Sequence, residues 1–340
     1  MRALLFALVS LLAACAGAPT TPTNPTKGTG DLGVVVERGS GTLATVDTSE
    51  RRVLAEVPGL GDLSHASVVF SRDGGSAFVF GRDGALTRVN LSTRRIEQRV
   101  QQAGNSIGGA MSQDGTLVAA QNYQPGGIKV FDAKTLALVA DIPAEYAPGQ
   151  RSRVVGLADL PGKRFVFSLF DADQIWIADL NDAARPKLTK FENVGRQPYD
   201  ALVTPDGRHY IAGLFGEDGL AMIDLWADKP VVRRILAGYG RGQEPLPVFK
   251  MPHLRGWAVA GRHAYLPAIG RHEVLVVDTQ TWAEVGRIAV AGQPVFVIAR
   301  PDGRQVWVNF AVPDYDRVQV LDTQPRQLVQ CRVAQQPGRE

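Results

Sequence analysis

A repeat of roughly 45 residues constrains this chain more than any other feature. Seven times along the 340 residues, a strand-like run ends in an apolar residue followed by Asp or Asn, and successive endings lie 42 to 54 residues apart. The seven endings are Asp47, Asn90, Asp132, Asp179, Asp224, Asp278 and Asp322. A period of this length indicates supersecondary units that stack on one another, because one unit cannot bury both of its faces alone.

Each unit reads as four short strands. Residues 108–142 illustrate it, with a strand, an Asp-Gly turn, a second strand, a loop, a third strand that ends at Asp132, a short turn and a fourth strand. No segment keeps a 3.6-residue apolar period over a dozen residues, which argues against a helical solenoid. The sequence therefore predicts an all-β fold, a β-propeller of four-stranded blades that forms a single domain over residues 31–330. The first unit, residues 33–57, is short and predicts outer strands only, so the chain's other end would supply its inner strands.

Composition excludes several classes of protein. Basic and acidic residues number 37 and 34 and are interspersed, so no basic block is available for nucleic acid. The two cysteines cannot build a zinc cluster or a disulfide framework, and no C-x-x-C-H sequence is present for a c-type heme. No apolar run reaches the roughly 18 residues of a membrane span.

The first thirty residues resemble a targeting sequence followed by a flexible tether. Arg2 and an apolar stretch that ends in Leu12-Ala13-Ala14-Cys15 resemble a bacterial lipoprotein signal peptide over residues 1–14, with Cys15 as the lipidated residue. A simple signal peptide with a chance cysteine is the alternative. Residues 15–30 have the Pro/Thr/Gly composition of a flexible tether, and residues 331–340 that of a polar tail. We expect a periplasmic protein that contacts the membrane through its lipid anchor only, and Ala16 favours the outer membrane over the inner one.

Polar residues recur where the innermost strands begin. Equivalent positions of a propeller converge on its central channel, so these residues are expected to form one ring at a funnel mouth. They are His65, Asn105, Arg153, Tyr199 with Asp200, and His253. Such a ring suits a large anionic, planar or metal-bearing ligand, whereas a wet channel with merely solvated side chains is the alternative. The Gly-rich run at residues 238–242 is followed by Pro-rich sequence and no βαβ unit surrounds it, so NAD is not expected.

Several strings at these positions resemble a known family. They are Leu63-Ser64-His65-Ala66, residues 79–84 with Arg82, Asn105-Ser106-Ile107-Gly108-Gly109, Gln197-Pro198-Tyr199-Asp200-Ala201 and Lys250-Met251-Pro252-His253-Leu254. Over about residues 31–323 the chain closely resembles the NirF family of heme d1 biosynthesis proteins, and more distantly the d1-binding propeller of cytochrome cd1 nitrite reductase.

The resemblance implies an eight-bladed propeller that binds a d1-type tetrapyrrole in its funnel. His65 matches the position of a heme iron ligand, Tyr123 that of a funnel tyrosine, and Arg153 that of an arginine facing ring carboxylates. Asn105, Arg82 and Lys250 complete the expected cofactor-binding set. About seven repeats are recognisable, and the family's last repeat is not, so the resemblance leaves open a ring of fewer blades or a truncated last blade.

The resemblance also implies a role in late heme d1 maturation for the nitrite reductase of denitrification. One reading is an enzyme, a dehydrogenase or other oxidoreductase that modifies the macrocycle or its side chains, with Asp200, Tyr199 and His253 as its acid–base groups. The other is a non-catalytic carrier or scaffold that hands heme d1 to partner proteins. The expected partners are the heme d1 precursor, other d1-maturation proteins and nitrite reductase, and a homodimer is left open.

Overall fold

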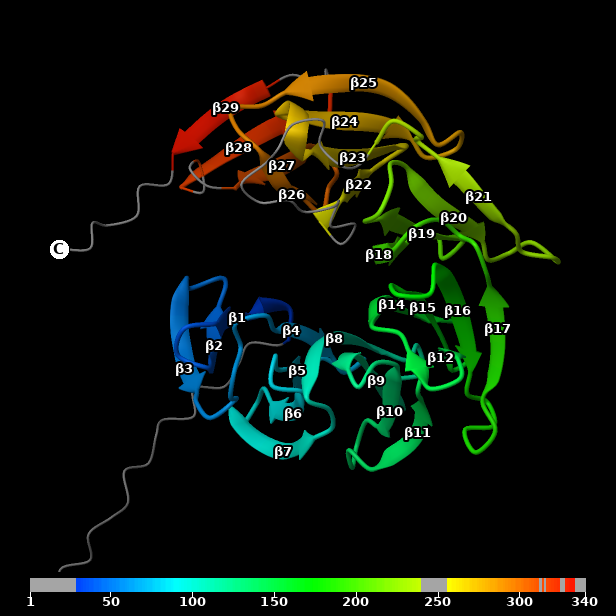
Figure 1. Ribbon diagram of the computed structural model, residues 1–340. Helices are drawn as coiled ribbons and strands as arrows, with labels where there is room; N and C mark the ends of the chain where they lie inside the picture. Colours follow the sequence, from blue (N-terminus) through cyan, green and yellow to red (C-terminus); the bar gives the residue numbers. More distant parts are fainter. Residues whose placement is uncertain (1–28, 240–255, 312–313, 315, 325–327, 334–340) are drawn as a thin grey trace, which may run out of the picture.

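The computed structural model describes residues 29–239, 256–311, 314, 316–324 and 328–333, the last strand by its backbone alone. These residues form seven antiparallel sheets in chain order and one small hairpin, and Figure 1 shows the sheets arranged around a central axis. The only helical segments in the described ranges are the single turns η1 (Thr29–Asp31) and η3 (Ile269–Arg271). The predicted all-β propeller is confirmed. No helix in the described ranges is long and apolar enough to cross a membrane.

The strands follow the predicted unit closely. The first sheet contains β1 (Leu32–Glu37), β2 (Thr42–Asp47) and β3 (Arg52–Val57). The second contains β4 (Ser67–Phe70), β5 (Ser76–Phe80), β6 (Ala85–Asn90) and β7 (Arg95–Gln101). The third contains β8 (Asn105–Met111), β9 (Leu117–Gln124), β10 (Ile128–Asp132) and β11 (Leu138–Ile142). The hairpin β12 (Glu145–Ala147) and β13 (Gln150–Arg151) follows.

The remaining four sheets repeat the same order. The fourth contains β14 (Val154–Leu160), β15 (Arg164–Leu169), β16 (Gln174–Asp179) and β17 (Lys187–Phe191). The fifth contains β18 (Pro198–Val203), β19 (His209–Leu214), β20 (Leu220–Asp224) and β21 (Val232–Ile235). The sixth contains β22 (Ala258–Ala260), β23 (His263–Ala268), β24 (Glu273–Asp278) and β25 (Ala283–Ala289). The seventh contains β26 (Pro294–Ala299), β27 (Gln305–Phe310), β28 (Arg317–Asp322) and β29 (Leu328–Val333).

The Asp or Asn that marks each repeat has a structural task. Each one is the last residue of the third strand of its unit, and its side-chain oxygen accepts backbone N–H groups of the turn that follows. Asp132 Oδ1, for example, accepts the N–H groups of Lys134 and Thr135 at 3.0 and 2.7 Å. The first of these bonds, from the N–H two residues further on, recurs at all seven endings. The repeat is therefore visible in the sequence because every blade reverses its chain with the same Asx turn.

The Asp-Gly turns join the first strand of a blade to the second, as predicted. In three blades a hydroxyl two residues before the Asp bonds its carboxylate, for instance Ser112 Oγ to Asp114 Oδ1 at 2.6 Å. The Gly that follows has a positive φ, for instance Gly115 at +72°.

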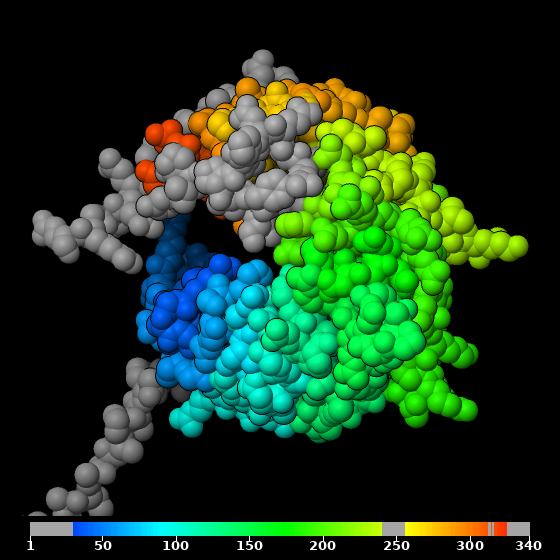
Figure 2. All heavy atoms as spheres, viewed as in Figure 1, coloured from blue at the N-terminus to red at the C-terminus, as the bar shows by residue number. Residues whose placement is uncertain are grey.

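The hydrophobic core is distributed between neighbouring blades. Six of the seven buried clusters in the described residues each lie between two successive sheets. Figure 2 shows the blades of the first five sheets, blue to yellow-green, packed side by side around the lower and right-hand parts of the ring. The innermost strands β4, β8, β14, β18, β22 and β26 surround the axis (Figure 1). Because each sheet from the second to the sixth packs on both neighbours, these sheets hold the starts of their innermost strands in fixed relative positions.

The first and last sheets differ from the others. In the first, β2 ends at Asp47 and so takes the third place of a blade, which makes β1 and β3 its second and fourth strands. No described strand pairs with the inner edge of β1, in agreement with the outer strands expected for this unit. In the last, the cross-strand neighbours Ile298 and Trp307 are 65% and 45% exposed on one face. Its β29 runs to Val333, beyond the domain limit predicted at residue 330.

β-Bulges recur near the starts of the innermost strands. The pairing register shifts between Pro198 and Ala201 in β18, and comparable shifts occur in β8, β14 and β26. A bulge places an extra residue in one strand and re-aims its side chains. In β18 the extra residue falls at Tyr199 and Asp200, two residues that the sequence singles out.

Candidate functional site

The candidate site lies at one end of the central channel. We call this end mouth N, because the innermost strands have their N-termini there. Since the second strand of each blade runs antiparallel to the first, the ends of β5, β9, β15 and β19 reach the same mouth. Two sets of residues therefore meet at mouth N: those that begin the first strands and those that end or follow the second strands.

A small aromatic cluster at mouth N is unlike the other buried clusters because it spans three blades. Ile107 of β8, Val155 of β14 and Phe170 are its buried members, and three partly buried aromatic side chains pack against them: Tyr123, Tyr199 and Phe215. The rings of Phe170, Tyr199 and Phe215 have centroids 5.6 to 5.8 Å apart in edge-on or tilted contact. This geometry favours aromatic–aromatic attraction and leaves an apolar, partly open surface at the channel.

The two tyrosines of the cluster share a hydrogen bond across the channel wall. Tyr123 Oη lies 3.1 Å from Tyr199 Oη, although the residues are 76 positions apart in the chain. Burial raises the pKa of Tyr123 well above its usual value, the neighbouring Tyr199 hydroxyl adds to this, and Arg153 and Arg82 oppose it. Tyr123 is therefore a neutral phenol at every physiological pH.

Two arginines flank this pair. The Arg82 guanidinium lies 5.7 Å from the centre of the Tyr123 ring, and no described carboxylate or carbonyl accepts a hydrogen bond from it. The Arg153 guanidinium lies 4.3 Å from the centre of the Phe170 ring and pairs with Asp171. The structure thus brings together Arg82, Tyr123, Arg153 and Tyr199 of the predicted set.

The other predicted residues at the starts of innermost strands lie as follows. His65 is exposed in the turn before β4. Asn105 is the first residue of β8, and its Oδ1 is buried with no hydrogen-bond partner among the described residues. Asp200 is half-buried in the bulge of β18, and its Oδ1 accepts the N–H of Ala201 at 3.0 Å. His253, Lys250 and Cys15 lie outside the described residues, as do the predicted signal peptide and most of the tether.

Sequence reasoning missed Phe170, Asp171 and Phe215. Phe170 and Phe215 directly follow the second strand of their blades, Asp171 and Arg82 are the second residue after theirs, and Tyr123 is the last residue but one of β9. The signal that identifies them is the antiparallel pairing itself: a residue that ends the second strand lies beside the start of the first. A search of both positions in every repeat finds all of them.

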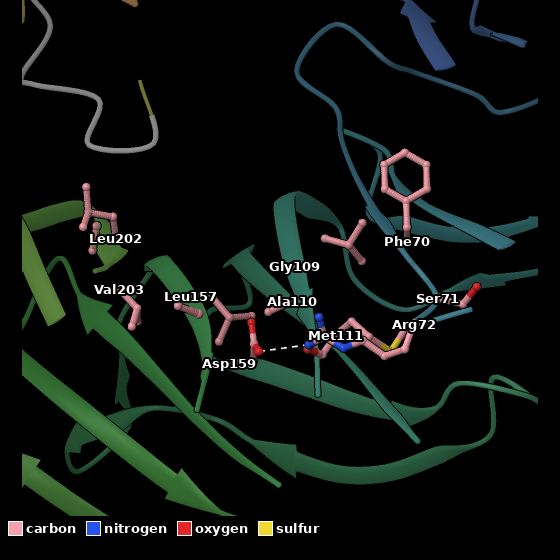
Figure 3. Close-up of a pocket in the computed structure, with 13 residues that line it drawn as sticks. Phe70, Ser71, Arg72, Gly109, Ala110, Met111, Leu157, Asp159, Leu202 and Val203 are labelled. Atoms are coloured by element: carbon pink, nitrogen blue, oxygen red, sulfur yellow. Dashed lines mark hydrogen bonds and ion pairs between the residues drawn. The ribbon is translucent and has the colours of Figure 1, made fainter. Parts of the chain in front are cut away.

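The opposite end of the channel is different in character. A cavity of about 510 Å³ there is lined by the C-terminal halves of β4, β8, β14 and β18 and by none of the predicted site residues. Figure 3 shows its walls of Phe70, Leu157, Leu202 and Val203, with an ion pair from Arg72 to Asp159 across it at 2.9 Å. Arg72 also donates to the carbonyl oxygens of Met111 and Ser112, so it ties three blades together.

No group of three or more His, Cys, Asp or Glu side chains in the described part of the chain is arranged to hold a metal ion. The only metal-related prediction that falls within that part is that His65 would bind the iron of a bound tetrapyrrole.

Comparison with known proteins settles the family. The family model of the cytochrome D1 heme domain matches residues 27–340. The chain belongs to this family. It is 60% identical over 328 residues to Protein NirF of Stutzerimonas stutzeri, and the alignment covers 96% of this chain and 82% of that protein. It is 57% identical over 332 residues to Protein NirF of Pseudomonas aeruginosa, at 97% and 83% coverage. The resemblance to NirF that the sequence strings indicate is confirmed.

A solved structure extends the likeness to three dimensions. The structure of "Dihydro-heme d1 dehydrogenase NirN in complex with DHE" superposes with a TM-score of 0.78 at 25% sequence identity. The match covers 94% of this chain and 66% of that one. This chain therefore shares its propeller fold with a protein whose structure was solved in complex with DHE.

Proposed function

We propose that this protein binds a d1-type tetrapyrrole at mouth N and takes part in the late maturation of heme d1 for nitrite reductase. The observation that carries the proposal is the cluster of Phe170, Tyr199, Phe215 and Tyr123, flanked by Arg82 and Arg153. An apolar aromatic surface with cations at its rim suits a flat macrocycle that carries acidic side chains. Membership of the cytochrome D1 heme domain family supports the same ligand class.

Unsatisfied polar atoms near mouth N fit a ligand as well. The Oδ1 of Asn105 and the Oγ of Ser67 on neighbouring inner strands are buried and have no hydrogen-bond partner among the described residues. Buried polar atoms are rarely left unpaired, so each such atom calls for a bound water or a ligand group. Asn105 would accept a hydrogen bond from the tetrapyrrole, and Arg82 and Arg153 would donate to its carboxylates. His65 would ligate the iron of the tetrapyrrole or orient its ring. The tetrapyrrole supplies the redox chemistry when it is bound.

We further propose that the protein acts on its ligand rather than only carrying it. The likeness to a dihydro-heme d1 dehydrogenase supports an enzyme. Asp200 and Tyr199, consecutive residues in the bulge of β18, are the groups that we propose to move a proton. His253 is the third member of the proposed acid–base set. Product analysis separates the two readings: an enzyme returns an altered tetrapyrrole, whereas a carrier releases the same molecule to nitrite reductase or another maturation protein.

The binding experiment is an absorbance titration of the full chain with heme d1 and with its dihydro precursor. We expect a saturating spectral shift in the wild-type protein, a different bound spectrum in His65→Ala because an iron ligand would be lost, and weaker binding in Arg82→Met. His209→Ala is the matched control for loss of an imidazole away from mouth N. No saturating shift in folded wild-type protein would contradict the proposal.

We also propose a periplasmic location with a lipid anchor at Cys15, on the strength of the sequence Leu12-Ala13-Ala14-Cys15. In cells, wild-type protein is expected in the detergent phase of a Triton X-114 partition, and Cys15→Ser in the aqueous phase. Recovery of both in the aqueous phase would remove the anchor from the proposal.

A further inference from the structure

Arg153 is held in place by one carboxylate from the turn that follows β15. Its Nε lies 3.0 Å and its Nη2 2.5 Å from oxygens of Asp171, and its backbone N–H donates to Asp171 Oδ2 at 2.9 Å. The Phe170 ring lies against the guanidinium at 4.3 Å. Asp171 is itself anchored, because its backbone N–H donates to Ser152 Oγ at 3.0 Å. Two bonds from one carboxylate and a ring contact fix both the position and the plane of the guanidinium.

This arrangement leaves one edge of the guanidinium unused. Nε and Nη2 serve Asp171, while the two N–H groups of Nη1 have no acceptor among the described residues. The Arg153 side chain is 44% exposed, so this edge is accessible from solvent. The hydrogen bonds to Asp171 raise the pKa of Arg153. Burial alone would raise the pKa of Asp171, but its hydrogen bonds from Arg153 lower it, so both groups stay charged.

Charge and geometry make different contributions here. Asp171 cancels most of the long-range attraction of Arg153 for an anion, since the two opposite charges are in contact. What remains is a donor pair with a fixed direction, and a fixed donor pair discriminates among ligand groups better than a mobile charge does. Arg82, which has no such hydrogen-bonded carboxylate in the described part of the chain, supplies the less directional attraction beside the Tyr123 ring.

We propose that Asp171 is a positioning residue: it orients Arg153 so that the free edge of the guanidinium reads a carboxylate on the ligand, and so sets a preference for tetrapyrroles with free acid side chains. The inference rests on the proposed function, because it concerns the ligand of mouth N. Asp171 lies outside the predicted site. Through Arg153 it would make the protein select ligands that carry a free carboxylate.

The test compares two probes, heme d1 and the same macrocycle with its carboxylates converted to methyl esters. A hydrogen-bonded charge pair corresponds to about a ten- to hundredfold change in Kd, so the wild-type protein is expected to prefer the free acid by about that factor. Arg153→Met removes most of this preference, and Arg82 accounts for what remains. Asp171→Asn reduces the preference severalfold, and the double variant behaves like Arg153→Met alone, because Asp171 acts through Arg153.

Asp159→Asn is the matched control, since it breaks an Arg–Asp pair of the same kind at the other end of the channel. Its preference for the free acid is expected to equal that of the wild type. Should Asp171→Asn melt below the assay temperature, Asp171→Glu, which keeps the charge and displaces it by one methylene, is expected to show the same reduced preference.

The outcomes separate the two proposals. A variant at Asp171 that folds and keeps the full preference, while Arg153→Met loses most of it, overturns the positioning role and leaves the proposed function standing. A wild-type protein that binds neither probe overturns the proposed function itself.

Discussion

The substitution Gly156→Ala tests how tightly the candidate site is built into the ring. Gly156 lies in the bulge of β14 with φ of +62°, a conformation that costs an L-residue about 1 to 2 kcal/mol. A Cβ at this position would lie 2.7 Å from the Cβ of Ala201 and 2.8 Å from the carbonyl oxygen of Tyr199, both on the next inner strand. Relief of such contacts in a packed interior costs about 1 to 3 kcal/mol more, so we expect a total loss of about 2 to 5 kcal/mol.

A matched glycine separates the two contributions. Gly207, in an Asp-Gly turn, has φ of +72°, and no atom lies within 4 Å of the place that a Cβ would take, so Gly207→Ala incurs the backbone cost alone. Urea unfolding of both variants measures the difference. With a slope of about 3 kcal/mol per molar, the midpoint of Gly156→Ala should fall about 0.3 to 1 M below that of Gly207→Ala.

Function should follow the same division. Displacement of the Tyr199 carbonyl disturbs the aromatic cluster, so Gly156→Ala is expected to weaken tetrapyrrole binding in the absorbance titration, while Gly207→Ala leaves it unchanged. Equal midpoints for the two variants would refute the reasoning, because they would mean that β14 and β18 are free to move apart at mouth N.

Three further predictions follow from buried and charged groups. Tyr210→Phe leaves Ser168 Oγ, 2.9 Å from the lost hydroxyl, without that partner, and should cost about 1 to 3 kcal/mol in urea unfolding, partly recovered by adding Ser168→Ala. Burial alone would raise the pKa of Asp114, but hydrogen bonds led by that from the Ser112 hydroxyl lower it to about 2. The contribution of the Asp114 carboxylate to the free energy of unfolding is thus full above about pH 4 and is lost as the pH falls towards 2. The free energy of unfolding of Asp114→Asn should therefore fall less than that of the wild type over this range, as measured by unfolding at a series of acid pH values. Tyr123 should show no phenolate absorbance at pH 10.5 in the folded protein, because its burial raises its pKa. Phenolate absorbance at this pH that is present in the wild type and absent from Tyr123→Phe would contradict that burial.

Local chemistry made much of the fold predictable. Asp132 and its equivalents announce each blade because an Asx turn needs that side chain at that position, and the Asp-Gly turns need a glycine for a positive φ. These requirements act within a few residues, so they can be recognised in a single sequence. The starts of the innermost strands could be located by counting from them, which placed Arg153 and Tyr199 at mouth N.

The rest of the site depends on contacts between blades. Phe170 and Phe215 look like ordinary core residues in the sequence, because nothing local distinguishes a ring that faces the channel from one that faces the next sheet. The bulges of β8, β14 and β18 are also invisible locally, since they follow from pairing with a partner strand. Asp171 could be recognised only once Arg153 was placed beside it.

The recurrent bulges have a consequence for how such a protein changes over evolutionary time. A bulge takes its residue out of the regular alternation of the strand, so Tyr199 and Asp200 can be exchanged while Ala201 and the residues after it keep their register with β19. Each of the four blades with a bulged innermost strand thus offers one or two substitutable positions on a frame whose stability is secured elsewhere. A ring built in this way can change its ligand specificity by a few independent substitutions, and every intermediate variant can still fold.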